Sequence, residues 1–564
     1  MKCIILILFI EYSIIFSRLI PSNNLTSAPE EASPGDVIEL QYGKYSSAPY
    51  KFVSGEKDKP IIIKAFWGAQ VTFSGNDNSC IFDLNDKSYI TIEGPFDLKD
   101  SLCGIKATNS SIIKISGLKI NNMKQQGIII SGENNKVANN EIYDCVTENK
   151  NKAKILTYGW KQCISVLGKK NNSYFSKDIT FKNNYIHNSW GEGLYFHKCD
   201  GCYSISNNIT NTFSMNLYIH SSKNIIIEGN IIRINSNDYD SHLGNACGIA
   251  FTSESSNENI VDNITIKNNI ILGTRIGIYF FQTGSSGYSK VKILHNTIWY
   301  ISVSPLWIEK PINIPSDCEL RNNLIYIEGW IADFYPKKSW TIGSNYYYNY
   351  GKIPNEYSDT VEKSKYVKNL DFDKIFNNKN GDCNYISKNL DIECLRPSTS
   401  PDNSFNLFHG GSSSNNIVDK DIAGCDRSNN NPTIGAFEYY LKCSDNYIVD
   451  ELKIQFKIQY CANQGELIKM IGDPWNWNHI YSPTFSYIGD CFWSYTFETI
   501  KEDFEYKFVI SNGFIVYRWE NDPNRVFNIF ELANAIKNNN FGYYENCNYY
   551  KEGNLVTLTC YWKG

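Results

Sequence analysis

The stretch KDITFKNNYIHNS (177–189) and the segments SISNNITNT (204–212) and NIIIEGNIIRI (224–234) share one pattern. Each has an alternating apolar run, an Asn pair or its stand-in, and a further apolar pair. Asn184, Asn208 and Asn230 take the same place in successive copies, 24 and 22 residues apart. A fixed period of this size with two-residue alternation predicts a solenoid of strands. We interpret the chain as all-β, with a right-handed parallel β-helix whose Asn side chains stack at bends and tolerate left-handed backbone.

Short partner strands such as GLYFH (193–197) and GIYFF (277–281) lie between the Asn-containing runs. Their first and third apolar residues point inward, so the residues between them project outward. Stacking the coils predicts an outward column of Tyr195 with His197, Tyr218 with His220, Ala250 with Thr252, Tyr279 with Phe281, and Trp307 with Glu309. Exposed rings suit a polysaccharide, because sugar rings have apolar faces. The alternative is that the rings reflect strand propensity and are covered by loops.

The polar residues near this column are candidates for chemistry. Hydrolysis of a glycosidic bond needs two carboxyl groups, and elimination next to a uronate needs a base plus a cation or metal. The catalytic candidates are Glu192, His197, His220, Asp238 and Asp240, followed by Asp200, Glu309, His242 and Arg275. Stacked imidazoles are expected to lower each other's pKa and supply a neutral base. The alternative is that all are ordinary polar residues of an outer strand. No metal or cofactor is expected.

The N-terminus and the cysteines indicate export. MKCIILILFIEYSIIFS (1–17) has the charge and apolar length of a secretory leader, which we place at 1–20. A membrane anchor is the alternative, but Glu11 interrupts the run and no later stretch could cross a bilayer. Sixteen cysteines follow the leader, which suits disulfides, and Cys199 and Cys202 are expected as a disulfide or free thiols rather than zinc ligands. We expect a soluble extracellular monomer.

The charge balance argues against one class of partner. The net charge is −5, and no run of Lys or Arg is present. Nucleic-acid binding is therefore not expected.

Two further segments, one at each end of the predicted solenoid, resemble segments of a known family. SPGDVIELQYGKY (33–45) opens the solenoid, and KDIAGCDRSNNNPTIGAFEY (420–439) closes it. Together with the repeats, over about 30–440, they resemble secreted β-helix proteins of the polysaccharide-lyase-like superfamily. The resemblance implies the fold and leaves the activity open.

The composition changes after residue 440. Residues 446–564 are rich in aromatic residues and in short alternating strands, which predicts a small β-sandwich. LIKMIGDPWNWNH (467–479) and FEYKFVISNGFIVYRWENDPNRVF (504–527) follow in order. Over about 455–530 the tail resembles starch-binding modules of carbohydrate-binding module family 20.

That resemblance implies a sugar site and leaves some positions open. It places Trp477, Lys507 and Trp519 on the glucan, with Glu520 and Asn524 as hydrogen-bonding neighbours. Trp475 competes with Trp477 for one place, and Tyr487 falls near one residue of the family's second site. Both site tryptophans could instead be core residues, a role for which Trp493 is the better candidate. The family gives no account of 531–564, where Cys547 and Cys560 could tie a hairpin.

Three hypotheses follow for the whole chain. The first is a secreted carbohydrate-active protein that binds starch or a related α-glucan through its tail and binds, and cleaves as a lyase or glycoside hydrolase, a second polysaccharide on its solenoid. The second is a non-catalytic glycan-binding protein. The third is a structural surface protein. Tethering a binding module to a catalytic domain raises its effective concentration at the substrate, which favours the first.

Overall fold

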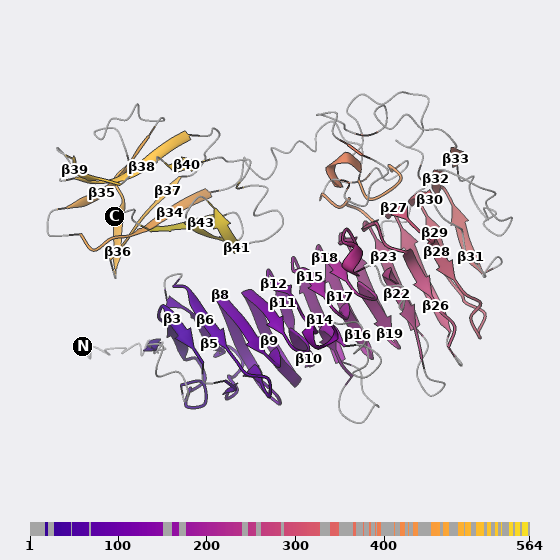
Figure 1. Ribbon diagram of the computed structural model, residues 1–564, viewed down its shortest axis with the longest axis horizontal. Coiled ribbons are helices and arrows are strands. Elements are labelled where there is room, and N and C mark those ends of the chain that lie inside the picture. Colours follow the sequence, from indigo (N-terminus) through magenta and orange to yellow (C-terminus); the bar gives the residue numbers. More distant parts are fainter. Residues whose placement is uncertain are drawn as a thin grey trace, which may run out of the picture.

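The computed structural model describes residues 17–20, most of 28–327, and shorter stretches within 339–437 and 453–561. In these residues the protein is nearly all-β, with a long solenoid and a smaller unit of two sheets (Figure 1). The solenoid strands pair in parallel and form three ladders along its length. The predicted all-β class and parallel coils are confirmed.

The first ladder contains β1 (Ser17–Ile20), β2 (Val37–Leu40), β5 (Ile61–Ala65), β8 (Ser88–Ser101), β9 (Cys103–Met123), β11 (Lys136–Ala138), β14 (Ser176–Lys182), β17 (Cys199–Ile205), β20 (Lys223–Glu228), β23 (Val261–Lys267), β26 (Tyr288–Leu294), β29 (Cys318–Arg321) and β31 (Trp340–Gly343). The second contains β3 (Gly43–Tyr45), β6 (Val71–Ser74), parts of β8 and β9, β12 (Glu141–Tyr143), β15 (Tyr185–Ser189), β18 (Asn208–Thr212), β21 (Ile231–Arg233), β24 (Ile270–Leu272), β27 (Thr297–Ile301), β30 (Leu324–Ile327), β32 (Tyr346–Tyr348) and β33 (Lys365–Val367). The third contains β4 (Tyr50–Lys51), β7 (Cys80–Asp83), the start of β9, β10 (Ile128–Glu133), β13 (Gln162–Val166), β16 (Glu192–His197), β19 (Leu217–His220), β22 (Cys247–Thr252), β25 (Ile276–Phe280) and β28 (Ser304–Ile308).

A buried Asn stack lies where the first ladder turns into the second. The backbone N–H of Asn184 donates to Asn207 Oδ1 at 2.9 Å, and that of Asn207 donates to Asn230 Oδ1 at 2.9 Å. The prediction of an Asn stack is confirmed for Asn184 and Asn230, but in the coil between them the stacked residue is Asn207 and not Asn208. Asn208 begins β18 and pairs with Tyr185. The stacked Asn is also not the left-handed residue, because the residue before it takes the positive φ, as Ser206 does at 53°.

The closing segment lies along the side of the solenoid at this same corner. Buried Arg427 donates to Asn268 Oδ1 at 2.8 Å and to the carbonyls of Gly435 and Ala436 at 2.9 and 3.0 Å. Buried His295 bonds the Thr433 carbonyl through Nδ1 at 3.1 Å. Arg427 therefore holds the closing segment against the solenoid, because a buried guanidinium needs several acceptors.

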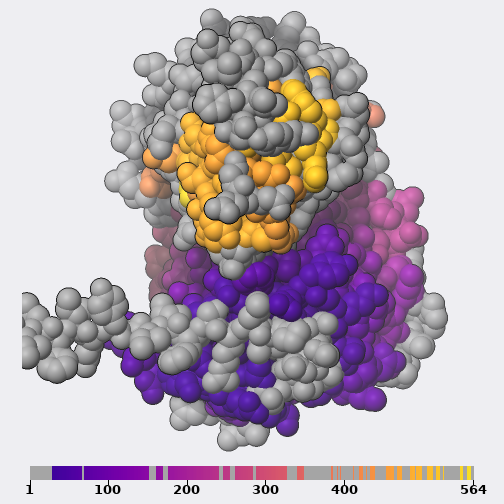
Figure 2. Space-filling view, turned by 90° about the vertical axis from the view of Figure 1, so that its left-hand side faces the viewer, coloured from indigo at the N-terminus to yellow at the C-terminus, as the bar shows by residue number. Residues whose placement is uncertain are grey.

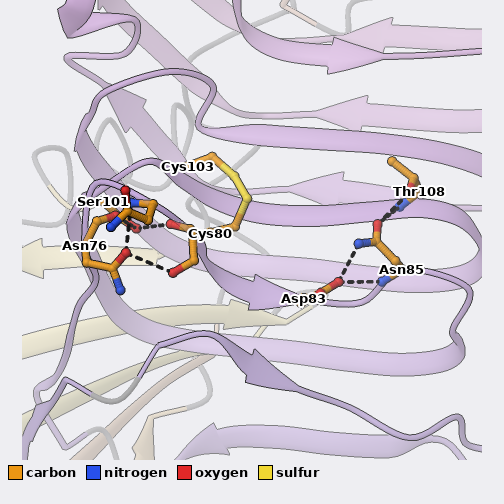
Figure 3. The surroundings of a disulfide bond; sticks show 9 residues. Asn76, Cys80, Asp83, Asn85, Ser101, Cys103 and Thr108 are labelled. Carbon is orange, nitrogen blue, oxygen red and sulfur yellow. Dashed lines mark hydrogen bonds between the residues drawn. A yellow bond between two sulfur atoms is a disulfide. The ribbon is translucent and has the colours of Figure 1, made fainter.

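Disulfides connect neighbouring parts of the coils. Cys80 and Cys103 join β7 to β9 on the third ladder (Figure 3). The described residues also contain disulfides Cys145–Cys163, Cys199–Cys202, Cys383–Cys394, Cys461–Cys491 and Cys547–Cys560. The C-x-x-C pair is therefore a disulfide, and the last pair ties two adjacent strands as anticipated. Of the expected leader, residues 17–20 form β1 beside β2, and residues 1–16 lie outside the described part.

The C-terminal unit is a β-sandwich. One sheet has the order β36 (Ser486–Gly489), β37 (Phe492–Phe497), β34 (Lys453–Gln459), β43 (Leu555–Tyr561), β42 (Cys547–Glu552) and β41 (Phe541–Tyr544). The other joins β35 (Leu467–Gly472), β38 (Phe504–Ser511) and β39 (Val516–Trp519), with β40 (Arg525–Phe527) also on β38. The predicted core residue Trp493 is buried between them. Figure 2 shows the orange and yellow surface of this unit next to the indigo N-terminal coils.

Three short 3₁₀ turns complete the described elements, Thr147–Asn149, Asn237–Tyr239 and Ile392–Leu395. The first two lie in insertions that interrupt the repeat, between β12 and β13 and between β21 and β22. Both insertions connect the second ladder to the third, so they enter at one border of the third ladder.

Candidate functional site

The outward column predicted from the repeats lies on the third ladder. Tyr195 pairs with Tyr218, Tyr218 with Ala250, Ala250 with Tyr279, and Tyr279 with Trp307. We call these five residues the site column. The alternating residues Leu194 and Phe196 point into the core and are fully buried, because successive strand residues face opposite sides. The predicted register is confirmed at each coil.

The prediction that these rings are openly exposed was wrong for the middle of the column. Tyr218 is 3% exposed and Tyr279 5%, whereas Tyr195 and Trp307 are half-buried. Ring contacts within the column explain the difference. The Tyr195 and Tyr218 centroids lie 5.2 Å apart, and those of Tyr279 and Trp307 lie 5.3 Å apart. The open apolar surface therefore lies at the two ends of the column.

A hydrogen-bond network links His220, one of the predicted catalytic candidates, to Glu254, an acid that the sequence reasoning missed. His220 Nδ1 lies 2.7 Å from the Tyr195 hydroxyl, and His220 Nε2 accepts from the backbone N–H of Glu254 at 3.3 Å. Nε2 is thus an acceptor, so the proton sits on Nδ1 and is donated to Tyr195. The Tyr218 hydroxyl donates to Glu254 Oε1 at 2.6 Å. His197 lies beside His220 as predicted, with ring centroids 4.6 Å apart, but the ring planes are tilted by 32° and are not stacked.

A second tyrosine–carboxylate pair lies two coils further along. The Tyr279 hydroxyl donates to Glu309 Oε1 at 3.1 Å, and the backbone N–H of Gln282 donates to Glu309 Oε2 at 2.7 Å. Both carboxylates follow a third-ladder strand, Glu254 after β22 and Glu309 after β28. The available signal for Glu254 was its place two residues after the end of β22, a strand of the third ladder. It was missed because it opens an insertion that has no repeat period.

Glu192, at the start of β16, is the most buried acid of this group. Its side chain is almost fully buried, and Oε2 has no hydrogen-bond partner in the described part of the chain. Burial raises the pKa of Glu192 to about 8; a hydrogen bond with Gln162 offsets part of the shift, and the charge of Glu254 adds to it. The carboxyl group therefore holds its proton at neutral pH, as a general acid must.

Of the other predicted catalytic residues, Asp238 and Asp200 do not join this group. Asp238 is exposed in the turn Asn237–Tyr239, at the corner where the Tyr239 ring packs on Trp190 at 4.8 Å. Asp200 pairs with Lys223 at 3.3 Å on the first ladder. Asp240 and His242 lie outside the described residues. Arg275 precedes β25 and lowers the pKa of the buried Cys247 thiol, against the larger upward effect of burial.

The sandwich presents a second candidate surface. Trp519 on β39 is 47% exposed and pairs with Val509 on β38. Lys507 lies two residues from Val509, so it shares the outer face with Trp519, whereas Tyr506 and Phe508 point into the core. The Lys507 side chain is largely covered, at 8% exposure. Trp475, Trp477 and Asn524 lie outside the described residues.

One residue of the predicted sugar site has a structural role instead. Glu520 is buried, and both of its oxygens bond Arg525, at 2.9 and 2.7 Å. Glu520 Oε2 also accepts the Phe508 N–H at 3.1 Å. Because this carboxylate is buried and held by Arg525, Glu520 stabilises the sheet and does not face the surface where a sugar would bind. Tyr487 is 58% exposed on the edge strand β36, with its ring 5.3 Å from that of Trp493.

Residues 103–298 match the family model described as "Right handed beta helix region". The solenoid is a right-handed parallel β-helix. No curated protein matches the sequence. Among solved structures, pectate lyase Pel9A is 15% identical, with 76% of this chain and 98% of that chain covered and a TM-score of 0.47. The complex of XylC with xylose is 12% identical, with 75% and 98% covered and a TM-score of 0.47. The adhesin PfbA of Streptococcus pneumoniae is 12% identical, with 58% and 80% covered and a TM-score of 0.40.

At these identities and TM-scores the solved structures carry no argument about activity. The described residues contain no group of three or more His, Cys, Asp or Glu side chains arranged to hold a metal ion. None of the helices in this same part of the chain has the length and apolarity needed to span a membrane.

Proposed function

We propose that the protein is a secreted carbohydrate-binding protein that holds starch or a related α-glucan on its sandwich and a second polysaccharide on its β-helix. The observation that carries the proposal is Trp519, a half-exposed indole on the outer face of the β35–β38–β39 sheet. An indole held half-exposed on a rigid sheet offers an apolar face on which a sugar ring can stack. Disulfides in both parts support an oxidising compartment.

The chemistry of the surface suits a glucan. The indole face stacks on the apolar face of a glucose ring, and the Lys507 ammonium donates to hydroxyl groups. Lys507 is held among buried neighbours, so less side-chain entropy is lost when it binds. The resemblance of 455–530 to starch-binding modules adds a second indole at Trp477, which would complete a two-sided grip.

The test is binding of the full chain to amylose resin. Trp519→Ala is expected to lower affinity at least tenfold, because about 1.4 kcal/mol of stacking energy corresponds to a factor of ten. Tyr550→Ala is the matched control, since Tyr550 is 40% exposed on β42 in the other sheet. Amylose binding that survives Trp519→Ala would remove this site from consideration.

A second candidate function, cleavage of the polysaccharide on the β-helix, is favoured by Glu192. A protonated buried carboxyl beside a second carboxyl group, here Glu254, is the pairing that glycosidic hydrolysis uses. The full chain would be incubated with starch, pectin, alginate and glucans while new reducing ends and the absorbance of unsaturated uronates are followed. Products that disappear in Glu192→Gln support cleavage. Silence on every substrate supports the alternative of a non-catalytic binding or structural surface protein.

A further inference from the structure

We infer that the site column takes a neutral, hydroxyl-rich glycan rather than a uronate polymer, with the Glu254 and Glu309 carboxylates accepting hydrogen bonds from sugar hydroxyls. The inference rests on the proposed glycan binding by the β-helix and names its substrate class. It is carried by two repeated tyrosine–carboxylate pairs and by a buried acid beside one of them.

The two pairs are built alike. In each, a column tyrosine donates its hydroxyl to one carboxylate oxygen, at 2.6 Å for Tyr218–Glu254 and 3.1 Å for Tyr279–Glu309. A carboxylate offers about four acceptor positions, so further donors can bind beside the tyrosine. Tyr218 and Tyr279 are two coils apart, which is about 10 Å at the usual strand spacing. Two oriented acceptors at this interval suit a chain whose hydroxyl groups repeat.

Glu192 supplies an independent observation at the same place. It is 5% exposed, and its Oε2 has no partner in the described residues, although burying a polar oxygen without a partner is costly. The charge of Glu254 helps to raise the pKa of the Glu192 carboxyl, and both acids help to raise the pKa of the Tyr218 hydroxyl. Three acids therefore lie along one column, two of them around Tyr218. The unpartnered oxygen is an unfilled hydrogen-bonding position within this group.

The charges disfavour an anionic substrate. A uronate brings one carboxylate for each sugar, and like charges at close range repel while losing hydration. Uronate recognition needs cations aimed at those carboxylates. Among the described residues, Arg275 lies at the bend before β25, where it acts on buried Cys247, and Lys310 directly follows Glu309. Glu192 holds its proton at neutral pH, so the two carboxylates left to repel a uronate are Glu254 and Glu309. The rings of Tyr195 and Trp307 at the two ends of the column add apolar contact that a neutral sugar can use.

The substrate class also restricts the chemistry. Elimination uses the carboxylate of the uronate to acidify the neighbouring C–H, so a neutral glycan offers no such step. Cleavage here would be hydrolysis. The Glu192 carboxyl would give its proton to the glycosidic oxygen, the C1–O bond would break with its electron pair going to that oxygen, and water would add to C1 while Glu254 takes a proton from it.

The experiment uses the full chain carrying Trp519→Ala, so that the sandwich does not contribute. Calorimetric titration would compare neutral malto-, cello- and xylo-oligosaccharides with oligogalacturonate and oligomannuronate. We expect at least one neutral series to bind, and both uronates to bind at least tenfold more weakly. Glu254→Gln and Glu309→Gln should each weaken neutral binding by about fivefold, because a charged acceptor becomes a neutral one.

A charge reversal gives a gain that misfolding cannot imitate. Glu254→Lys should raise uronate affinity at least tenfold, and added salt should reverse that gain. Asp200→Lys is the control, because Asp200 lies on the first ladder away from the column. Uronates that bind the parent more tightly than every neutral glycan would overturn the inference while leaving glycan binding by the β-helix intact. Neutral binding that ignores both Glu→Gln changes would also overturn it. Absence of all binding would overturn the inference together with the β-helix part of the proposed function, and the amylose result would be unaffected.

Discussion

Two outward aromatic columns run along neighbouring ladders of the same solenoid, and they differ in what contacts them from outside. On the second ladder, Trp299 stacks on Tyr326 with centroids 4.9 Å apart, and Tyr326 stacks on Tyr348 at 5.3 Å. We call these three residues the covered column. Chain from beyond the last coils closes over them through apolar residues that include Phe376, Leu390, Leu395, Ile434 and Phe437. The site column has similar ring spacings but meets carboxylates at its hydroxyl groups.

The comparison shows that outward aromatic rings on a solenoid do not by themselves define a binding surface. Both columns obey the same strand alternation, and both place rings outside the coil. What lies above each column decides its role. An apolar segment fastened by Arg427 makes one column part of a second core. Oriented acids beside the other column make it a place where polar ligands can be held.

The largest expected effect separates the two columns by stability. Trp299 is fully buried, whereas Trp307 is half-buried. Trp299→Ala should lower the free energy of unfolding by about 3–5 kcal/mol through the cavity it leaves, and Trp307→Ala by clearly less. Thermal unfolding would measure both. Oligosaccharide binding should show the reverse order, because Trp307→Ala should lower the affinity more than Trp299→Ala does. Equal destabilisation by the two changes would break the distinction.

The next effect concerns what holds the cover in place. Arg427→Met removes the buried guanidinium that bonds Asn268 and the carbonyls of Gly435 and Ala436. Leaving these acceptors unpaired should cost about 3 kcal/mol. Arg427→Lys is the matched variant. It should lose nearly as much stability as Arg427→Met, because lysine lacks the planar guanidinium that bonds several acceptors at once. An unchanged melting temperature in Arg427→Met would show that apolar packing alone holds the segment.

A third effect belongs to the site column alone and depends on pH. The folded Glu192 carboxyl keeps its proton to about pH 8, whereas its usual pKa is 4.5. The folded state therefore binds one more proton between these values, so stability falls as pH rises from 4.5 to 8. Glu192→Gln should match the parent at pH 4 and exceed it by a few kcal/mol at pH 9, at about 1.4 kcal/mol for each pKa unit. Melting temperatures across this range test it; parallel pH profiles would contradict the buried protonated state.

The smallest effect concerns one hydroxyl group. Tyr218→Phe removes the donor to Glu254 and keeps the buried ring. Because that bond has a charged acceptor, the loss should be about 1–2 kcal/mol of stability, and neutral-glycan affinity should fall with it. Tyr279→Phe is the companion change at Glu309. If only stability falls, in both variants, the tyrosines hold the acids without affecting the ligand.

Much of the β-helix could be predicted because its repeats are local. Alternation between inward and outward residues follows from strand geometry, so the register from Tyr195 to Trp307 could be predicted from short segments. The Asn stack was found with one member shifted by one residue, since adjacent asparagines look alike and only their hydrogen bonds tell Asn207 from Asn208. In the sandwich, alternation likewise indicated that Trp493 is buried.

The sequence alone therefore determined the coils, the side to which each strand residue points, and the half-exposed Trp519 as a candidate for glucan binding. Only the tertiary structure decided what covers each column. Arg427 reaches back 159 residues to Asn268, Glu254 enters the site from an insertion without a period, and Glu520 bonds Arg525 instead of a sugar. Local periodicity encodes the direction of a side chain. Contacts made by non-repeating segments depend on where the chain returns, which no short stretch specifies.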